Sequence, residues 1–204
     1  MSRSDRIHSI ASEIGALALQ GSVSNKHDLE RLVATAVSEF DRIDVVINNS
    51  GHPAGGKITS ISDEHWMDVF QMYFLSVVRM ARLVTPIMVK QRGGSIVNIS
   101  GHDATEPDPR FPVASTIRAS MGAFRKLYAR EYGPLGIRMN CLMPSVVLDS
   151  GENVIPEDVR KQIPTGRAAT HQEIAKVALF LASDKASYVT GHGLRVDGGA
   201  SRAF

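Results

Sequence analysis

Cysteine is nearly absent from this sequence: Cys141 is the only one among 204 residues. A single cysteine excludes an internal disulfide and fits a reducing compartment, so we expect the protein in the cytoplasm. Because Cys141 stands within an apolar run, we expect a buried thiol rather than a reactive one. An excess of one charge is also lacking, since 23 lysines and arginines nearly balance 21 aspartates and glutamates. With no basic run, we expect neither a nucleic-acid partner nor an anionic membrane partner.

Long apolar runs and metal-ligand spacings are missing too. No apolar stretch approaches the length that spans a bilayer, and no apolar segment follows the charged N-terminus as a secretory signal would require. No ligand spacing such as HExxH occurs, so we expect no metal site. With 43% hydrophobic and 22% charged residues, the composition is that of a globular protein, and the length predicts one domain over residues 1–204.

Apolar runs typical of buried strands alternate with segments of helical periodicity. We expect strands at residues 43–49, 95–100, 137–144 and 194–197, with a shorter apolar run at 16–23. We expect helices at residues 28–40, 62–90 and 113–132, a short helix opening at Pro156, and a helix at 174–182 behind a Thr170/Glu173 capping box. We expect the methionines of the long helix, Met67, Met72, Met80 and Met88, to pack in the core or at a subunit interface.

This alternation predicts βαβ units and therefore a doubly wound α/β fold with a parallel sheet. The expected strands lack period-two alternation, so we expect them to be buried on both faces. In such sheets, ligands bind beyond the carboxyl ends of the strands. The candidate site therefore lies at residues 48–52, 100–103 and 143–149.

Several segments in the correct order resemble the short-chain dehydrogenases/reductases. Asn48-Asn49-Ser50-Gly51 resembles that family's NNAG motif, and residues 93–100 resemble its fifth strand. Further resemblance lies at residues 129–140, 143–145, 166–167, 180–184, 188–191 and 196–199, so that it covers nearly the whole chain. The resemblance implies a Rossmann-like domain that binds NAD or NADP and transfers a hydride to or from a carbonyl carbon.

The same resemblance locates the family's catalytic set. Its proton-donating Tyr falls on Ala114, and the Lys that lowers the pKa of that Tyr falls on Arg118. Its Ser falls on Gly101 and its relay Asn falls on Tyr73. Arg118 keeps the positive charge, but a guanidinium differs in shape from an ammonium. We therefore expect the ordinary chemistry of the family to be lost.

The family's cofactor-binding start is missing as well. The first strand-helix-strand unit, with its glycine-rich turn that holds the pyrophosphate, has no counterpart in these residues. The remaining candidate cofactor contacts are Asn48, Ser50, Gly51 and Pro144. Without the first strand, either residues 16–23 pair beside residues 43–49 or the sheet has a gap.

Two histidines offer a different chemistry. His52 and His102 each follow the glycine at the end of a strand, so we expect both over one cleft, with Asp103 beside one and Arg118 on the helix behind. Histidine titrates near neutral pH, so this set could act in general acid–base catalysis, although solvated loop histidines are the simpler interpretation.

Three hypotheses follow. The chain is a short-chain dehydrogenase/reductase homologue without ordinary redox activity that acts as a binding or regulatory subunit. Alternatively, it is an atypical oxidoreductase, dehydratase or isomerase that uses residues such as His52 and His102. Thirdly, it is the product of a late start codon, whose longer form would bind cofactor but would still carry Gly101 and Ala114. In each case we expect a nucleotide or small-molecule ligand, and a homodimer or homotetramer.

Overall fold

A four-stranded parallel sheet organises the computed structural model, which describes residues 1–148 and 155–202. The strand order is β1-β2-β3-β6. Their bounds are β1 Val45–Asn48, β2 Gly94–Ile99, β3 Ile137–Pro144 and β6 Gly193–Val196. Register joins Val46 to Ile96 and Ile96 to Met139, so the carboxyl ends of three strands lie at one edge. The expected parallel α/β architecture is confirmed.

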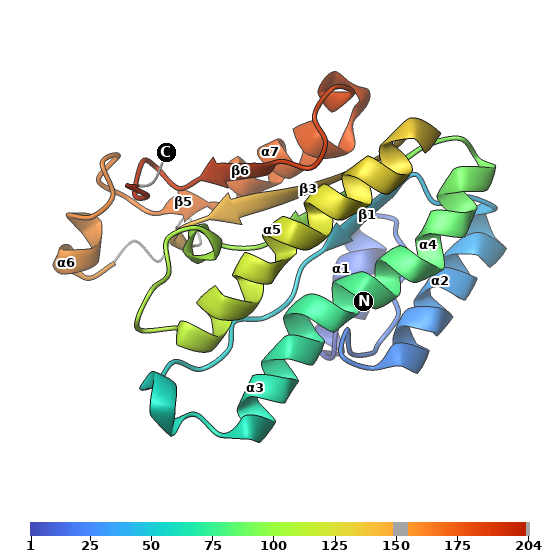
Figure 1. Ribbon diagram of the computed structural model, residues 1–204. Coiled ribbons are helices and arrows are strands. Elements are labelled where there is room, and N and C mark those ends of the chain that lie inside the picture. Colours follow the sequence, from blue (N-terminus) through green and yellow to red (C-terminus); the bar gives the residue numbers. More distant parts are fainter. Residues whose placement is uncertain (149–154, 203–204) are drawn as a thin grey trace.

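Helices cover both faces of this sheet (Figure 1). The first face packs on α2 (Lys26–Phe40), α4 (Ser76–Lys90) and α5 (Pro112–Tyr132). Its core joins Leu29, Val84, Met88, Ile96 and Met139. On the second face, α7 (His171–Ala182) packs its Ala178 and Leu181 on Val97 and Leu142. Neighbouring strand residues therefore serve opposite layers, as buried parallel strands require.

The strand β1 departs from the expectation of burial on both faces. Val45 is 41% exposed and Ile47 is 50% exposed, whereas the central strand β3 is buried along nearly its whole length. The reason is position: β1 is an edge strand, and β2 is the only described strand that pairs with it. Residues 16–23 do not pair with β1, and among them only Gln20 forms a bridge, to Ser2. Of the two alternatives for the sheet, the gap is confirmed.

The expected helix at residues 62–90 is divided by a π-helical turn. Ser62 caps α3 (Asp63–Phe70), a π turn spans Gln71–Leu75, and α4 follows. In length and composition, Asp63–Lys90 qualifies as a membrane-spanning helix, with a mean hydropathy of 1.4, which corrects the expectation that no such stretch exists. Its Val84 and Met88 are fully buried, however, and a core helix passes the same test. Of its methionines, Met80 and Met88 are in the core and Met67 is 54% exposed.

The remaining elements are short. They are α1 (Arg6–Glu13), α6 (Glu157–Arg160), the paired strands β4 (Val147–Leu148) and β5 (Ala169–Thr170), and 3-10 turns at Ile58–Ser60, His102–Ala104, Gly133–Leu135 and Asp184–Ala186. The predicted capping box is confirmed: Thr170 Oγ1 accepts from the Glu173 amide, and the Glu173 carboxylate accepts from the Thr170 amide. Cys141 is buried in β3 as expected.

Candidate functional site

A cavity of about 380 Å³ lies at the carboxyl ends of β1, β2 and β3, and we call it the carboxyl-end cavity. Ser50, Gly51 and His52 line it after β1, and Gly101, His102 and Asp103 after β2. Pro144 and the residues that follow it close the third side, and α5 contributes Arg118. Three separate loops thus meet where parallel strands end, which confirms the expected location.

The two histidines line this one cavity, as predicted. His52 Nδ1 lies 2.9 Å from the carbonyl oxygen of Pro53, so the proton on Nδ1 is donated there and Nε2 is the free ring nitrogen. Phe111 packs against the His52 ring edge-on, with ring centres 4.5 Å apart. The ring of His52 is therefore held in orientation by a carbonyl and an aromatic face.

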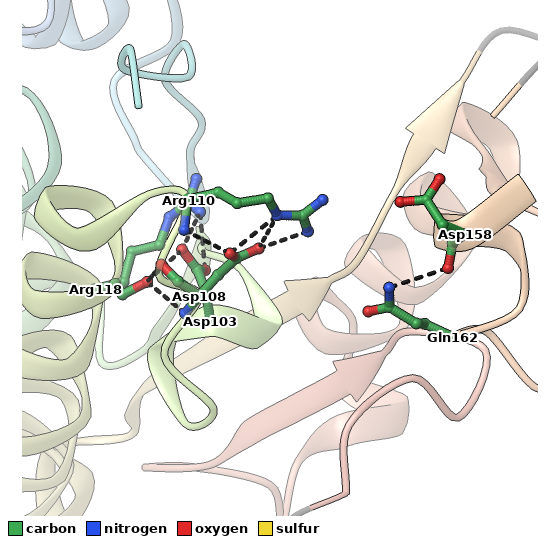
Figure 2. A network of polar contacts seen from close by, with 7 residues as sticks. Asp103, Asp108, Arg110, Arg118, Asp158 and Gln162 are labelled. Atoms are coloured by element: carbon green, nitrogen blue, oxygen red, sulfur yellow. Dashed lines mark hydrogen bonds and ion pairs between the residues drawn. The ribbon is translucent and has the colours of Figure 1, made fainter. Parts of the chain in front are cut away.

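Asp103 and Arg118 form a buried ion pair at the back of the cavity (Figure 2). Arg118 Nη1 lies 2.9 Å and 3.0 Å from the two carboxylate oxygens of Asp103. The side chains are only 5% (Asp103) and 14% (Arg118) exposed, so the pair is shielded from solvent screening. Both residues line the cavity with the two histidines, as predicted, but the ion pair between them was not predicted.

Tyr73 completes this network from the π turn. Its Oη accepts a hydrogen bond of 2.9 Å from Arg118 Nη2. Burial raises the pKa of Tyr73, and Asp103 adds to this, while Arg118 opposes it. The phenol therefore stays protonated at neutral pH and can donate a hydrogen bond but not act as a base. In the sequence, Tyr73 marks only a replaced Asn, and nothing there indicates its bond to Arg118.

Gly101 is surrounded by this network. A Cβ at this position would overlap Asp103 Oδ1 and would lie 2.7 Å from Arg118 Nη1. The space that the family's Ser side chain would need is thus already filled by the ion pair. Ser100, one position earlier, lines the cavity, and its hydroxyl is buried without a hydrogen-bond partner in the described part of the chain.

Ala114 brings no polar group to this network. It is fully buried in an apolar cluster with Val69, Tyr73, Val113 and Ile117. Its methyl group fills a packed position, where it neither lines the carboxyl-end cavity nor offers a proton. The next residue, Ser115, has a polar role instead: its hydroxyl accepts from the Asp108 amide at 3.0 Å and lies 3.4 Å from Asp103 Oδ2.

A second ion pair stands at the mouth of the cavity (Figure 2). Arg110 Nη2 lies 2.7 Å from Asp108 Oδ2, and Nε lies 3.0 Å from each carboxylate oxygen. These hydrogen bonds hold the pKa of Asp108 below its ordinary value against the opposing effect of burial. Sequence reasoning missed Asp108, Arg110 and Ser115, because they lie in a polar loop and at a helix start without a recognisable spacing.

The candidate cofactor contacts do not fit a complete dinucleotide. Asn48 Nδ2 donates to Asn98 Oδ1 at 2.8 Å, so its side-chain amide is already used to join β1 to β2. Pro144 has no backbone N–H to offer a ligand. A pyrophosphate is typically held by backbone amides at a helix N-terminus, and no described strand pairs with β1 on the side away from β2 to lead into such a helix. Arg118, which stands at the position of the family's Lys, is occupied by Asp103 and Tyr73.

A metal site needs several ligating side chains that lie close together. Within residues 1–148 and 155–202, the histidine, cysteine and carboxylate side chains form no group of three that could hold a metal ion. Asp149, the last residue of the candidate segment 143–149, lies outside the described residues.

Comparison with known proteins shows to which family the chain belongs. The enoyl-(acyl carrier protein) reductase family matches residues 1–201. The 3-oxoacyl-[acyl-carrier-protein] reductase of Thermotoga maritima is 33% identical over 181 residues, which are 87% of this chain and 74% of the relative. The chain belongs to the short-chain dehydrogenase/reductase family.

Solved structures of the short-chain dehydrogenases/reductases agree with this membership. YwfH, an NADPH-dependent reductase involved in bacilysin biosynthesis, is 26% identical with a TM-score of 0.91. L-sorbose reductase from Gluconobacter frateurii, complexed with NADPH and L-sorbose, is also 26% identical, with a TM-score of 0.89. Both matches cover 100% of this chain, and 87% and 86% of those proteins.

Proposed function

We propose that this short-chain dehydrogenase/reductase has lost ordinary NAD(P)-dependent carbonyl and alcohol redox activity and acts as a binding or regulatory subunit. Its relatives bear the names of active reductases, so the proposal rests on this chain's own residues. The observation that carries it is the buried network of Asp103, Arg118 and Tyr73, which fills the space around Gly101.

Three features of the site support the loss of reductase chemistry. An alkoxide formed from a carbonyl needs a proton donor in place, and position 114 offers a methyl group in an apolar cluster. Arg118 cannot take over the role of the family's Lys while its guanidinium bonds a carboxylate and a phenol. Since burial raises the pKa of Tyr73, this phenol also ionises less readily to the phenolate.

The same cavity supports binding of a small molecule with acceptor oxygens. Both carboxylates at its wall are already paired, Asp103 with Arg118 and Asp108 with Arg110. The groups left to contact a ligand include the rings of His52 and His102. NAD and NADP are the family's cofactors, and by this proposal neither binds tightly to the chain.

The redox part is tested by following the oxidation of NADPH and NADH by the pure protein with acetoacetyl-coenzyme A. The Thermotoga maritima reductase serves as the positive control. We expect no turnover above background and no fluorescence change when either reduced cofactor is titrated alone. Turnover at a rate like that of the control enzyme contradicts the proposal.

The binding part is tested by thermal shift with small oxo-acids such as acetoacetate. We expect a saturable rise in Tm that is lost in His52→Gln, in the cavity, and kept in His171→Gln, which lies on α7. Equal responses of the two variants, or no rise in the unaltered protein, count against a ligand site in this cavity.

One observation favours a second function, an isomerase or dehydratase that needs no nicotinamide. His52 and His102 line one cavity, and His52 is held in orientation by Pro53 and Phe111. Two imidazoles can remove a proton from one carbon and return one elsewhere, with no oxidant consumed. If an isomerisation or dehydration is found, we expect His52→Gln and His102→Gln each to abolish it, whereas His171→Gln, on α7, leaves it intact.

We also propose that the chain forms a homodimer or homotetramer in the cytoplasm. Exposed apolar side chains on two helices support this, namely Leu127 on α5 and Met67 on α3. Light scattering at micromolar concentration is expected to give a mass of two or four chains, and a monomer mass contradicts this proposal. Leu127→Lys is expected to lower the mass without unfolding the chain.

A further inference from the structure

The ring of Phe111 has two polar neighbours in the carboxyl-end cavity. The ring of His52 packs edge-on against it, with ring centres 4.5 Å apart. The guanidinium carbon of Arg110 lies 5.8 Å from the centre of the same ring. All three side chains belong to residues that line the cavity. A small molecule seated on Phe111 can therefore contact His52 and Arg110 at the same time.

The carbonyl oxygen of Pro53 determines how His52 can bind a ligand. A carbonyl oxygen only accepts hydrogen bonds, so Nδ1 of His52, which lies 2.9 Å from it, carries the proton of the neutral ring. Nε2 then presents a lone pair and can only accept. A ligand hydroxyl satisfies this nitrogen by donating to it, whereas a ketone oxygen would place one acceptor against another.

Arg110 offers donors for an anionic group. Its hydrogen bonds to Asp108 use Nε and Nη2, so in the described part of the chain Nη1 keeps its two hydrogens for a ligand. Arginine binds carboxylates through such N–H groups. The charge of Asp108 is compensated by Arg110 and that of Asp103 by Arg118, so neither carboxylate presents an uncompensated negative charge to an anionic ligand.

We propose that the carboxyl-end cavity selects small hydroxy acids over the corresponding oxo-acids, and that His52 determines this preference. The ligand carboxylate accepts from Arg110 Nη1, its carbon chain packs on Phe111, and its hydroxyl donates to His52 Nε2. The inference rests on the proposed function, because it requires that this cavity binds a small molecule, and it adds the chemical class of that molecule.

Two acids that differ at a single carbon test the preference. 3-Hydroxybutyrate and acetoacetate share a carbon chain and a carboxylate, but only 3-hydroxybutyrate has a hydroxyl group that can donate. Isothermal titration calorimetry is done at about pH 8, where histidine is ordinarily neutral. We expect the Kd of 3-hydroxybutyrate to be about tenfold lower, as one additional hydrogen bond predicts.

Substitution of His52 tests which residue sets this ratio. His52→Phe keeps a ring against Phe111 but removes the acceptor, so we expect the Kd values of the two acids to become equal within about twofold. His171→Phe, on α7, is the matched control and is expected to keep the tenfold ratio. A ratio that survives in His52→Phe contradicts the role given to His52.

Substitution of Arg110 has a different expected pattern. Because both acids carry the carboxylate, we expect Arg110→Met to raise both Kd values by similar factors and to leave their ratio unchanged. Arg42→Met is the control, since its guanidinium pairs with Asp44 on the surface, and it is expected to change neither Kd. Unchanged Kd values in Arg110→Met contradict the carboxylate contact.

The tautomer of His52 can be checked without any ligand. Long-range ¹H–¹⁵N NMR shows which ring nitrogen carries the proton, and we expect Nδ1 in the neutral ring. A proton on Nε2 overturns the inference.

The remaining outcomes separate this inference from the proposed function. Equal affinities for the two acids, or tighter binding of acetoacetate, overturn the preference but leave a ligand site in the cavity. Binding of neither acid to the folded chain removes both the inference and the ligand site on which it rests.

Discussion

Arg118 on α5 donates a hydrogen bond to the phenol of Tyr73 in the π turn, and its guanidinium carbon lies 4.7 Å from the centre of the same ring. The contact joins the π turn to α5 through two residues that are 45 positions apart in the sequence. It also joins two positions at which this chain departs from the pattern of the short-chain dehydrogenases/reductases. Replacement at one position is thus matched structurally by replacement at the other.

Removing the phenol oxygen leaves Arg118 Nη2 without this acceptor. We expect Tyr73→Phe to lower the free energy of unfolding by about 1–3 kcal/mol, the usual cost of an unsatisfied buried polar group. Urea denaturation measures it. Tyr188→Phe is the control, because Tyr188 is fully exposed and its hydroxyl is hydrated in either state. Equal effects of the two substitutions would show that the Arg118 bond has no stabilising role.

Breaking the buried ion pair has a larger effect. We expect Arg118→Met or Asp103→Asn to lower the free energy of unfolding by about 3–5 kcal/mol, because each leaves a buried partner uncompensated. The double variant is expected to lose much less than the sum, as coupled residues do. Arg160→Met, which breaks an exposed pair with Glu157, should change little. Additive losses in the double variant would contradict the coupling.

The space around Gly101 predicts a cost for any side chain. We expect Gly101→Ala to destabilise the protein by about 1–3 kcal/mol, since its Cβ overlaps the carboxylate of Asp103. Gly101→Ser, although it restores the family's residue, meets the same obstacle. The control is Gly133→Ala, where a Cβ meets no atom within 4 Å. Thermal unfolding of the three variants makes the comparison, and a Gly101→Ala variant as stable as the control is the contrary outcome.

The capping box of α7 predicts a dependence of stability on acid. Hydrogen bonds, first from Arg167 and then from the Thr170 amide, lower the pKa of Glu173 from 4.5 to about 2. The ionised carboxylate therefore stabilises the fold above pH 4.5, and this contribution is lost as the pH falls from 4.5 toward 2.

The test is to measure Tm of the unaltered protein and of Glu173→Gln across this range. We expect the variant to melt lower at neutral pH and the difference to vanish as the solution is acidified. Glu39→Gln, on the exposed end of α2, is the control and should show no such convergence. A constant difference at every pH would mean that the charge of Glu173 is irrelevant.

Much of the fold was predictable because its signals are local. A run rich in apolar residues predicted the strand at residues 137–144, and β3 has those bounds. Capping residues predicted the starts of α3 and α7, since an N-cap uses side chains within three residues of the helix start. The burial of β1 was predicted wrongly, because an apolar run does not reveal whether another strand lies beside it.

The candidate site was predictable in place but not in detail. Strand ends follow from topology, so His52, His102 and Asp103 could be expected together. The bond between Tyr73 and Arg118 depends on how two helices are rotated against each other, which no spacing in the sequence specifies. The same holds for Ser115, whose hydroxyl is positioned by the fold of a loop seven residues away.

Because Cys141 is buried, the reactivity of its thiol reports local opening of the structure. Burial raises the pKa of this sole thiol, and it lies in the strand at the centre of the core. A maleimide can then react only during moments when β3 comes apart from its neighbours. The rate at which the unaltered chain is labelled would therefore measure how often the sheet opens.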